Sequence, residues 1–139
     1  MSLDVYLELL REDGQMKQIS RAEWDARNPG REPVTVPAAV YERDTTVYHA
    51  KITHNLNAMA DAAGLYIYLW RPDEHHIQTA QQLIAPLREG LARLQATPGL
   101  YKIFNPDNGW GTYEGLVSFV REYLAACEQY PAATVRVSR

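Results

Sequence analysis

Hydrophobic and polar residues alternate at the N-terminal end of the chain. Leu3, Val5, Leu7 and Leu9 are separated by residues with polar groups, so the segment 3–10 has one apolar face. This period of two is typical of a strand with one buried face. The sequence therefore begins with a predicted strand.

Three further segments have the composition or the period of strands. The segments 34–43 and 46–52 are rich in Val, Thr and Tyr, and residues 43–45 join them. Pro37 places the first of these strands at a sheet edge or at a bend. The last segment, 132–138, alternates again, and we expect it to dock into the sheet beside the first strand.

After Thr53 the apolar residues recur at helical spacing as far as Ala63. Thr53 is a good N-cap, because its hydroxyl can accept a hydrogen bond from a free backbone N–H of the first turn. Gly64 is a natural end for this helix. The segment 65–70 fits a strand or a helix, and we favour a short helix because Pro72 follows so closely.

Pro72 and the two acidic residues after it predict the start of another helix. Its apolar residues keep a spacing of three and four as far as Leu94. Pro86 should kink this helix or restart it as a second one. Thr97-Pro98-Gly99 should end it, and the segment 100–110 reads as a turn-rich connection.

The last predicted helix opens at Gly111 or Thr112 and ends at Tyr130-Pro131. The order of strands, helices and a final strand predicts an α+β fold. We expect an antiparallel or mixed sheet of about four strands, with three to four helices packed on one face.

The length of 139 residues predicts a single domain, residues 1–139. The segment 11–33 is polar and interrupted by Gly and Pro. It predicts an irregular insertion or a long loop, and the alternative is a loop with one short helix around residues 21–26.

The net charge of −3 argues against general nucleic-acid binding, because phosphate neutralisation needs a basic face. No stretch is long enough to span a bilayer, and the N-terminus lacks the basic residues of a signal peptide. Cys127 is the single cysteine, which suits a reducing compartment and is typical of a buried small hydrophobe rather than a reactive thiol. We expect a cytoplasmic protein that does not bind membranes.

The chain has no phosphate-binding loop, dinucleotide fingerprint, nucleophile elbow or zinc-type spacing of Cys and His. We therefore predict no catalytic residue, no metal ligand and no cofactor. His75 and His76 are adjacent, so on a helix they would point roughly 100° apart, which is wrong for one metal. A metal or acid–base site from Asp4, His49 and His54 is the alternative, if the strands bring them together.

The first polar segment that is typical of a binding site is Thr53-His54-Asn55, at a predicted strand-to-helix junction. Such a junction exposes free backbone N–H groups, and the hydroxyl, imidazole and amide side chains can recognise the polar edge of a small molecule. The structural alternative is that Thr53 caps the helix and Asn55 bonds locally.

The second such segment is 105–113. Its asparagines, Asn105 and Asn108, and the aromatic Trp110 and Tyr113 combine amide recognition with an aromatic surface, as many ligand pockets do. The alternative is a turn whose Trp packs on the core. Trp70 and Arg71 form a further pair suited to planar or anionic groups, with a core Trp and a surface Arg as the alternative.

Several short motifs, spread over almost the whole chain, carry a resemblance to a known family. They are Leu3-Asp4-Val5-Tyr6-Leu7, Ile52-Thr53-His54-Asn55-Leu56 with Met59-Ala60, Leu69-Trp70-Arg71-Pro72, Asn105-Pro106 with Asn108-Gly109-Trp110-Gly111, and Tyr130-Pro131 leading to Ser138-Arg139. In these motifs the chain resembles a widespread, functionally uncharacterised family of small proteins from bacteria, phages and prophages. The segment 11–41 matches nothing in it.

The resemblance implies a shared fold and a common site, and no particular activity. A phage context favours interference with host defence, including sequestration of nucleotide signals.

Three functions follow as hypotheses. The first is non-catalytic binding of a small polar, nucleotide-like ligand by the two polar segments. The second is an enzyme with His54 as general base or metal ligand, helped by Asp4 or His49. The third is a protein-interaction module or a homo-oligomer that uses the long segment 11–33 and the strand with Pro37. The residues predicted to bind the ligand are Thr53, His54, Asn55, Trp70, Arg71, Asn105, Asn108, Trp110 and Tyr113.

Overall fold

The protein is described here by a computed structural model. The structure describes residues 2–9, 16–19, 40–43 and 45–139, and for 16–19 and 40–43 only the backbone. The chain forms two compact units. One contains residues 1–9 and 46–139, and the other contains residues 10–45. Each unit is considered by itself.

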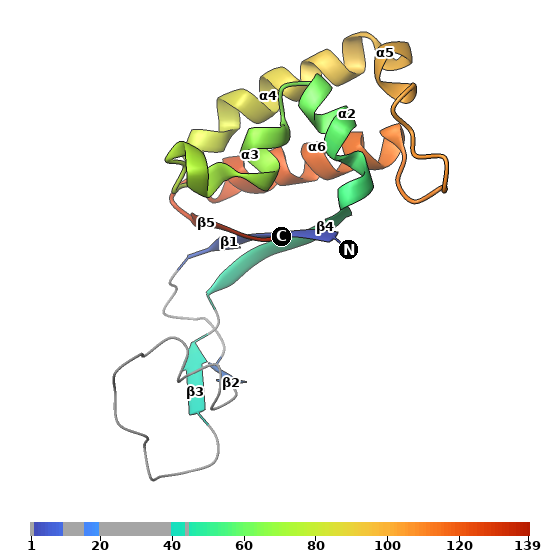
Figure 1. The fold of residues 1–139 in the computed structure, drawn as a ribbon. Helices are drawn as coiled ribbons and strands as arrows, with labels where there is room; N and C mark the ends of the chain where they lie inside the picture. The colour runs from blue at the N-terminus through green and yellow to red at the C-terminus, as the bar shows by residue number, and fades with distance from the viewer. Residues whose placement is uncertain (1, 10–15, 20–39, 44) are drawn as a thin grey trace. The chain divides into compact units, whose positions relative to one another are not determined.

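The larger unit contains a three-stranded antiparallel sheet (Figure 1). Its central strand is β1, Ser2–Glu8, with β4, Thr46–Thr53, on one side and β5, Thr134–Ser138, on the other. β1 and β5 pair from Asp4 with Ser138 to Glu8 with Thr134. The predictions of a first strand with one buried face and of a last strand beside it are confirmed.

The smaller unit contains a two-stranded antiparallel sheet. Its strands are β2, Met16–Ile19, and β3, Val40–Arg43. We expected one sheet of about four strands, but β3 pairs with β2 instead of joining the other three. β2 lies within the segment 11–33 that we predicted as irregular. The remaining predictions on 20–39, including the short helix around 21–26 and the edge position of Pro37, concern residues outside those described.

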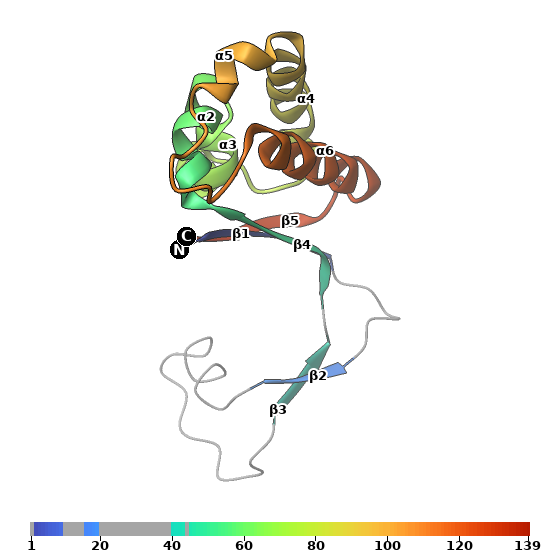
Figure 2. The same ribbon diagram turned by 90° about the vertical axis from the view of Figure 1, so that its right-hand side faces the viewer.

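The helices all pack on one face of the three-stranded sheet (Figures 1 and 2). The described part of the chain has five α-helices and two 3₁₀-helices, more than the three to four that we expected. In chain order they are η1 (His54–Leu56), α2 (Asn57–Ala62), α3 (Tyr66–Trp70), η2 (Pro72–His75), α4 (Gln81–Ala96), α5 (Pro98–Lys102) and α6 (Tyr113–Gln129). None of these helices has the length and apolarity needed to cross a membrane.

The short helix predicted over 65–70 is confirmed as α3. The long helix predicted to start at Pro72 does not start there, because Pro72 begins only the short η2. η2 ends where His76 takes a left-handed conformation, with φ of 60°. The long helix α4 starts later, at Gln81, and runs without interruption through Pro86. The prediction that Thr97-Pro98-Gly99 ends this helix is confirmed, because α4 stops at Ala96 with Thr97 as its C-cap. The turn-rich connection predicted over 100–110 was wrong at its start, because Pro98 is the first residue of α5, where its missing N–H costs nothing.

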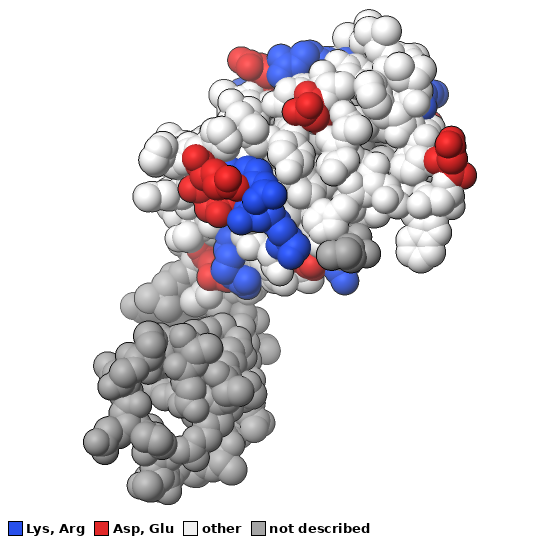
Figure 3. Space-filling model, viewed as in Figure 1, with Lys and Arg blue, Asp and Glu red and all other residues white. Residues whose placement is uncertain are grey.

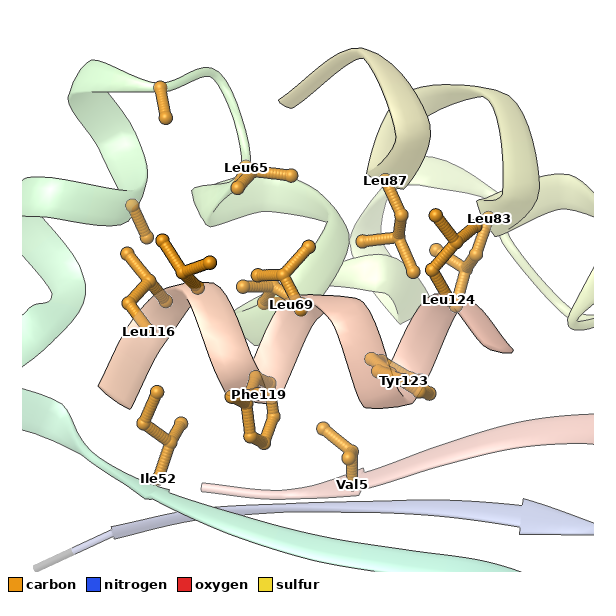
Figure 4. Close-up of a cluster of buried hydrophobic side chains, with 14 of the residues drawn as sticks. Val5, Ile52, Leu65, Leu69, Leu83, Leu87, Leu116, Phe119, Tyr123 and Leu124 are labelled. Atoms are coloured by element: carbon orange, nitrogen blue, oxygen red, sulfur yellow. The ribbon is translucent and has the colours of Figure 1, made fainter. Parts of the chain in front are cut away.

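The core lies between α6, the sheet and the other helices (Figure 4). Phe119 and Tyr123 of α6 lie on the side of the sheet, near Val5 and Ile52, while Leu65 and Leu87 lie on the opposite side of α6. This central position explains why α6 has apolar residues on most of its surface, with nine of its residues buried.

The other face of the sheet is polar. His49 of β4, Tyr6 of β1 and Arg136 of β5 are direct cross-strand neighbours. The His49 and Tyr6 rings stack at 4.4 Å with an angle of 2°, and the guanidinium carbon of Arg136 lies 3.8 Å from the Tyr6 centroid. Asp4 bonds to His49 at 2.9 Å, and Arg136 donates to Glu8 at 2.6 Å. Cross-strand pairs of this kind stabilise a sheet without apolar contacts.

Candidate functional site

Thr53 ends β4 and caps the helical turn that follows. Its hydroxyl oxygen accepts a hydrogen bond from the backbone N–H of Asn55 at 3.3 Å. The predicted N-cap is therefore confirmed. The turn that it caps is the three-residue η1. Thr53 already occupies one of the free backbone N–H groups of this turn, so that N–H group is not available to a ligand.

His54 and Trp70 are joined by a short hydrogen bond between their side chains. The indole Nε1–H of Trp70 donates to Nδ1 of His54 over 2.8 Å. The Trp70 side chain is 2% exposed, so this bond satisfies a buried donor. An indole can only donate, so Nδ1 of His54 must be unprotonated and the neutral ring carries its proton on Nε2. Within the described chain, no group bonds to Nε2.

Two further side chains extend this cluster along α3. The ring of Tyr66 stacks on Trp70 at 5.6 Å with an angle of 18°. Arg71 donates from Nε to the Tyr66 hydroxyl at 3.4 Å and pairs with Glu74 at 3.0 Å. Trp70 and Arg71, both predicted to bind a ligand, thus lie in one cluster, and Tyr66 is the residue that links them.

Arg139 approaches the same cluster from the end of β5. It donates to the backbone oxygen of Trp70 at 2.8 Å and to both carboxylate oxygens of Asp73. Its hydrogen bonds hold the pKa of Asp73 below the ordinary value. Figure 3 shows basic and acidic groups side by side where η2 and the C-terminal residue lie in Figure 1.

The segment 105–113 is a hydrogen-bonded turn in front of α6. Asn105 accepts from the N–H of Tyr113 at 2.8 Å, and Asn108 accepts from the N–H of Trp110 at 2.9 Å. Tyr113 is buried and donates its hydroxyl proton to the backbone oxygen of Leu94 at 2.7 Å. These three side chains hold the turn in shape. The Trp110 side chain, in contrast, is 70% exposed.

The two predicted segments contact each other through side chains of the first segment and the backbone of the second. The amide of Asn55 donates to the backbone oxygen of Trp110 at 3.3 Å. A Cβ atom on Gly111 would lie 2.8 Å from a methyl carbon of Thr53 and 2.9 Å from Leu56, so only glycine allows this approach. Thr53, Asn55 and the turn therefore meet, whereas His54 bonds to Trp70 instead.

A depression lies beside the Trp70 cluster. It has a volume of about 290 Å³ and is lined by Asn57, Ala58 and Asp61 of α2 and by Tyr66 of α3. The Asp61 carboxylate has no hydrogen-bond or ion-pair partner within the described chain. Asn57 and Asp61 were missed in the sequence, although their spacing of four places them on one face of a helix.

Asp4 and His49 pair with each other on the polar face of the sheet, at 2.9 Å. The sequence placed both of them with His54 in one alternative site, but the structure pairs His54 with Trp70. Among the described residues, no group of three or more His, Cys, Asp and Glu side chains is arranged to hold a metal ion. His75 and His76 are exposed at the end of η2.

Cys127 lies in the core on α6 and is fully buried. Burial, together with the charge of Glu128, raises the pKa of its thiol from 9.0 to about 12. The thiol therefore stays protonated at neutral pH and is a poor nucleophile. The prediction of a buried small hydrophobe is confirmed.

Comparisons with known proteins leave the family open. No family model matches the chain, and neither the curated proteins nor the solved structures include one that is significantly similar. The resemblance to small bacterial and phage proteins stays a prediction from its motifs.

Proposed function

We propose that this protein binds a small polar ring compound, without transforming it, in the depression beside the Trp70 cluster. The observation that carries this proposal is the bond from Trp70 to His54. Trp70 also stacks on Tyr66, which lines the depression, so the bond holds His54 in the same cluster, and Nε2 of His54 bonds to no group of the described chain.

The depression has the polarity of a recognition site. Asp61 offers an uncompensated acceptor, Asn57 offers an amide that can donate and accept, and Tyr66 offers an aromatic ring. Pockets for small molecules combine an apolar wall with a few such polar groups. An unpaired carboxylate favours a ligand that presents N–H or O–H groups, such as an amino-substituted ring or a sugar hydroxyl.

The size of the depression limits the ligand. A volume of about 290 Å³ is at the lower end of the roughly 300–1,000 Å³ found for small-molecule pockets. One ring system with its substituents fits this volume, and a dinucleotide does not. Nucleobases and nucleosides have the required ring, size and donor groups, and Arg71, which bonds to the hydroxyl of the lining residue Tyr66, is the cation that a monophosphate would contact.

The other residues predicted to bind the ligand, apart from the exposed Trp110, form hydrogen bonds within the protein. Thr53 caps η1, Asn55 bonds to the turn, and Asn105, Asn108 and Tyr113 hold the turn in place. In our proposal the ligand contacts are made by Asn57, Asp61 and Tyr66, which line the depression, and by His54 and Arg71, which bond to Trp70 and Tyr66.

The enzyme hypothesis has less support. A histidine that acts as general base is usually oriented by a carboxylate or carbonyl acceptor, but Nδ1 of His54 accepts from an indole. Its expected helpers, Asp4 and His49, bond to each other. The phage and host-defence context rests on the motif resemblance alone.

A thermal-shift screen with nucleobases, nucleosides and nucleoside monophosphates tests the proposal. A ligand at a hundred times its Kd contributes about 2.7 kcal/mol, which raises the melting temperature by several degrees. Asp61→Asn keeps the shape of the side chain and should remove most of this shift. Glu89→Gln changes an exposed carboxylate of α4 and should leave it intact. A panel in which no compound stabilises the protein would contradict the proposal.

A further inference from the structure

The large hydrophobic side chains that are exposed in the described chain all lie in one short segment. They are Leu100, 63% exposed, Ile103, 77% exposed, Phe104, 37% exposed, and Trp110. Leu100, Ile103 and Phe104 are spaced i, i+3 and i+4, so they share one face of α5 and of the turn that extends it. The opposite face is anchored by the buried Tyr101. We call the three exposed residues the α5 stripe.

A groove with apolar walls lies next to α5. It has a volume of about 420 Å³ and runs along the first half of α6, beside the end of α4. Its lining residues are Gln95, Tyr113, Glu114, Val117, Ser118 and Arg121.

Lys102 connects the α5 stripe to the groove. It lies on α5 between Leu100 and Ile103, and its Nζ is 5.5 Å from the centroid of the Tyr113 ring. The same nitrogen lies 3.7 Å from the Glu114 carboxylate. Because Tyr113 and Glu114 both line the groove, Lys102 places α5 beside the groove.

The charge of this surface is not balanced at Arg121. Every other arginine whose side chain the structure describes bonds to an acid or to a backbone oxygen: Arg71, Arg88, Arg93, Arg136 and Arg139. Arg121 has no such partner within the described residues. The only acid in the groove, Glu114, is already paired with Lys102. The groove therefore contains one guanidinium without a partner among the described residues, together with the apolar side chains of Tyr113 and Val117.

We propose that the α5 stripe and this groove together bind a peptide segment of a partner protein that carries apolar side chains and an acidic residue. The stripe supplies contacts for the apolar side chains, and Arg121 binds the carboxylate with its two-pronged geometry. Exposed apolar surface gathered at one place on an otherwise polar surface is typical of a protein-binding site. This surface shares no residue with the depression proposed to bind a small molecule.

The charge argues for a partner segment over a second copy of the chain. Among its described residues, the chain has no exposed large hydrophobic side chains outside this region. A second copy of the described residues could therefore offer large exposed hydrophobic side chains only from the same segment, whose one acidic residue is Asp107, whereas a partner segment can match both the stripe and Arg121.

Selection of random 12-residue peptides displayed on phage, with the full chain as bait, tests this inference. We expect enriched peptides that contain Asp or Glu together with at least two large hydrophobic residues. A synthetic peptide of that sequence should bind at least tenfold more weakly to Arg121→Gln and to Ile103→Ser. Both side chains are exposed, so the variants should fold, which circular dichroism checks. The control Arg88→Gln, on the exposed surface of α4, should bind like the unaltered chain.

Three results would overturn the inference. They are the absence of any enriched peptide, enriched peptides without acids, and binding that Arg121→Gln leaves unchanged. A solution mass that rises with concentration and returns to that of one chain in Ile103→Ser would show that a second copy occupies the surface instead.

Discussion

The indole Nε1–H of Trp70 donates to Nδ1 of His54 over 2.8 Å, and this bond joins α3 to the turn that follows β4. Because the indole is buried, the bond has a structural role in addition to the proposed role in binding. Removing the acceptor leaves a buried donor without a partner, which costs about 1–3 kcal/mol.

His54→Ala should therefore lower the free energy of unfolding by about 1–3 kcal/mol in urea denaturation. The matched control is His75→Ala, which removes an exposed histidine and should change it by less than about 0.5 kcal/mol. If the two variants were equally stable, the His54–Trp70 bond would not contribute to folding.

Gly111 allows the turn before α6 to approach η1. It has φ of 107°, and a Cβ atom there would lie 2.8 Å from Thr53 and 2.9 Å from Leu56. Gly111→Ala should destabilise the protein by about 2 kcal/mol or more, since it adds backbone strain to a steric clash. The control is Gly99→Ala, where a Cβ meets nothing within 4 Å, and thermal denaturation should show little change. An equal effect of both substitutions would mean that the approach at Gly111 is looser than described.

Gly90 plays a similar part inside α4. A Cβ atom on it would lie 2.2 Å from the side chain of Leu65. Alanine is the better helix former by about 1 kcal/mol, yet Gly90→Ala should destabilise the protein because the clash outweighs this gain. In a double-mutant cycle with Leu65→Ala, the loss caused by Gly90→Ala should largely disappear. Additive losses would show that the two residues do not touch.

The Cys127 thiol makes the free energy of unfolding depend on pH in the alkaline range. Its pKa rises from 9.0 to about 12 on folding, so between these values the folded state holds a proton that the unfolded state has lost. The contribution is complete below pH 9 and is lost as pH rises towards 12, with a slope of up to about 1.4 kcal/mol per pH unit.

Urea denaturation of the unaltered chain and of Cys127→Ala at pH 8 and pH 11 measures this effect. The variant should lose less stability over this range than the unaltered chain. Tyr48 contributes a similar alkaline loss in both proteins, since burial raises its pKa to about 12, so only the difference between the two proteins is diagnostic. Identical losses would show that the Cys127 thiol titrates alike in the folded and unfolded states.

The local features of the fold could be predicted from the sequence. Helix starts were predicted at Thr53 and at Gly111 or Thr112, and both Thr53 and Thr112 accept a backbone hydrogen bond as N-caps. Features that depend on distant partners could not be predicted. The residues 40–43 have the composition of a sheet strand, but only the pairing with 16–19 shows that they belong to a separate hairpin.

The candidate site shows the same limit. Both polar segments were found from their composition, and the bond from Asn55 to Trp110 brings them together across 55 positions. Composition did not reveal that most of their polar groups are used within the protein. It also did not indicate Asn57 and Asp61, because their proposed role depends on Tyr66 of the next helix, which completes the depression.

Titration of ¹⁵N-labelled protein with the nucleobase and nucleoside panel, followed through the indole N–H resonances of the tryptophans, tests the central claim most directly. The account predicts that at least one compound moves the Trp70 resonance in a saturable way and leaves the resonance of Trp110 in place. Asp61→Asn should weaken this response at least tenfold. If no compound moves the Trp70 resonance, or if Asp61→Asn responds like the unaltered chain, the proposed binding site is contradicted.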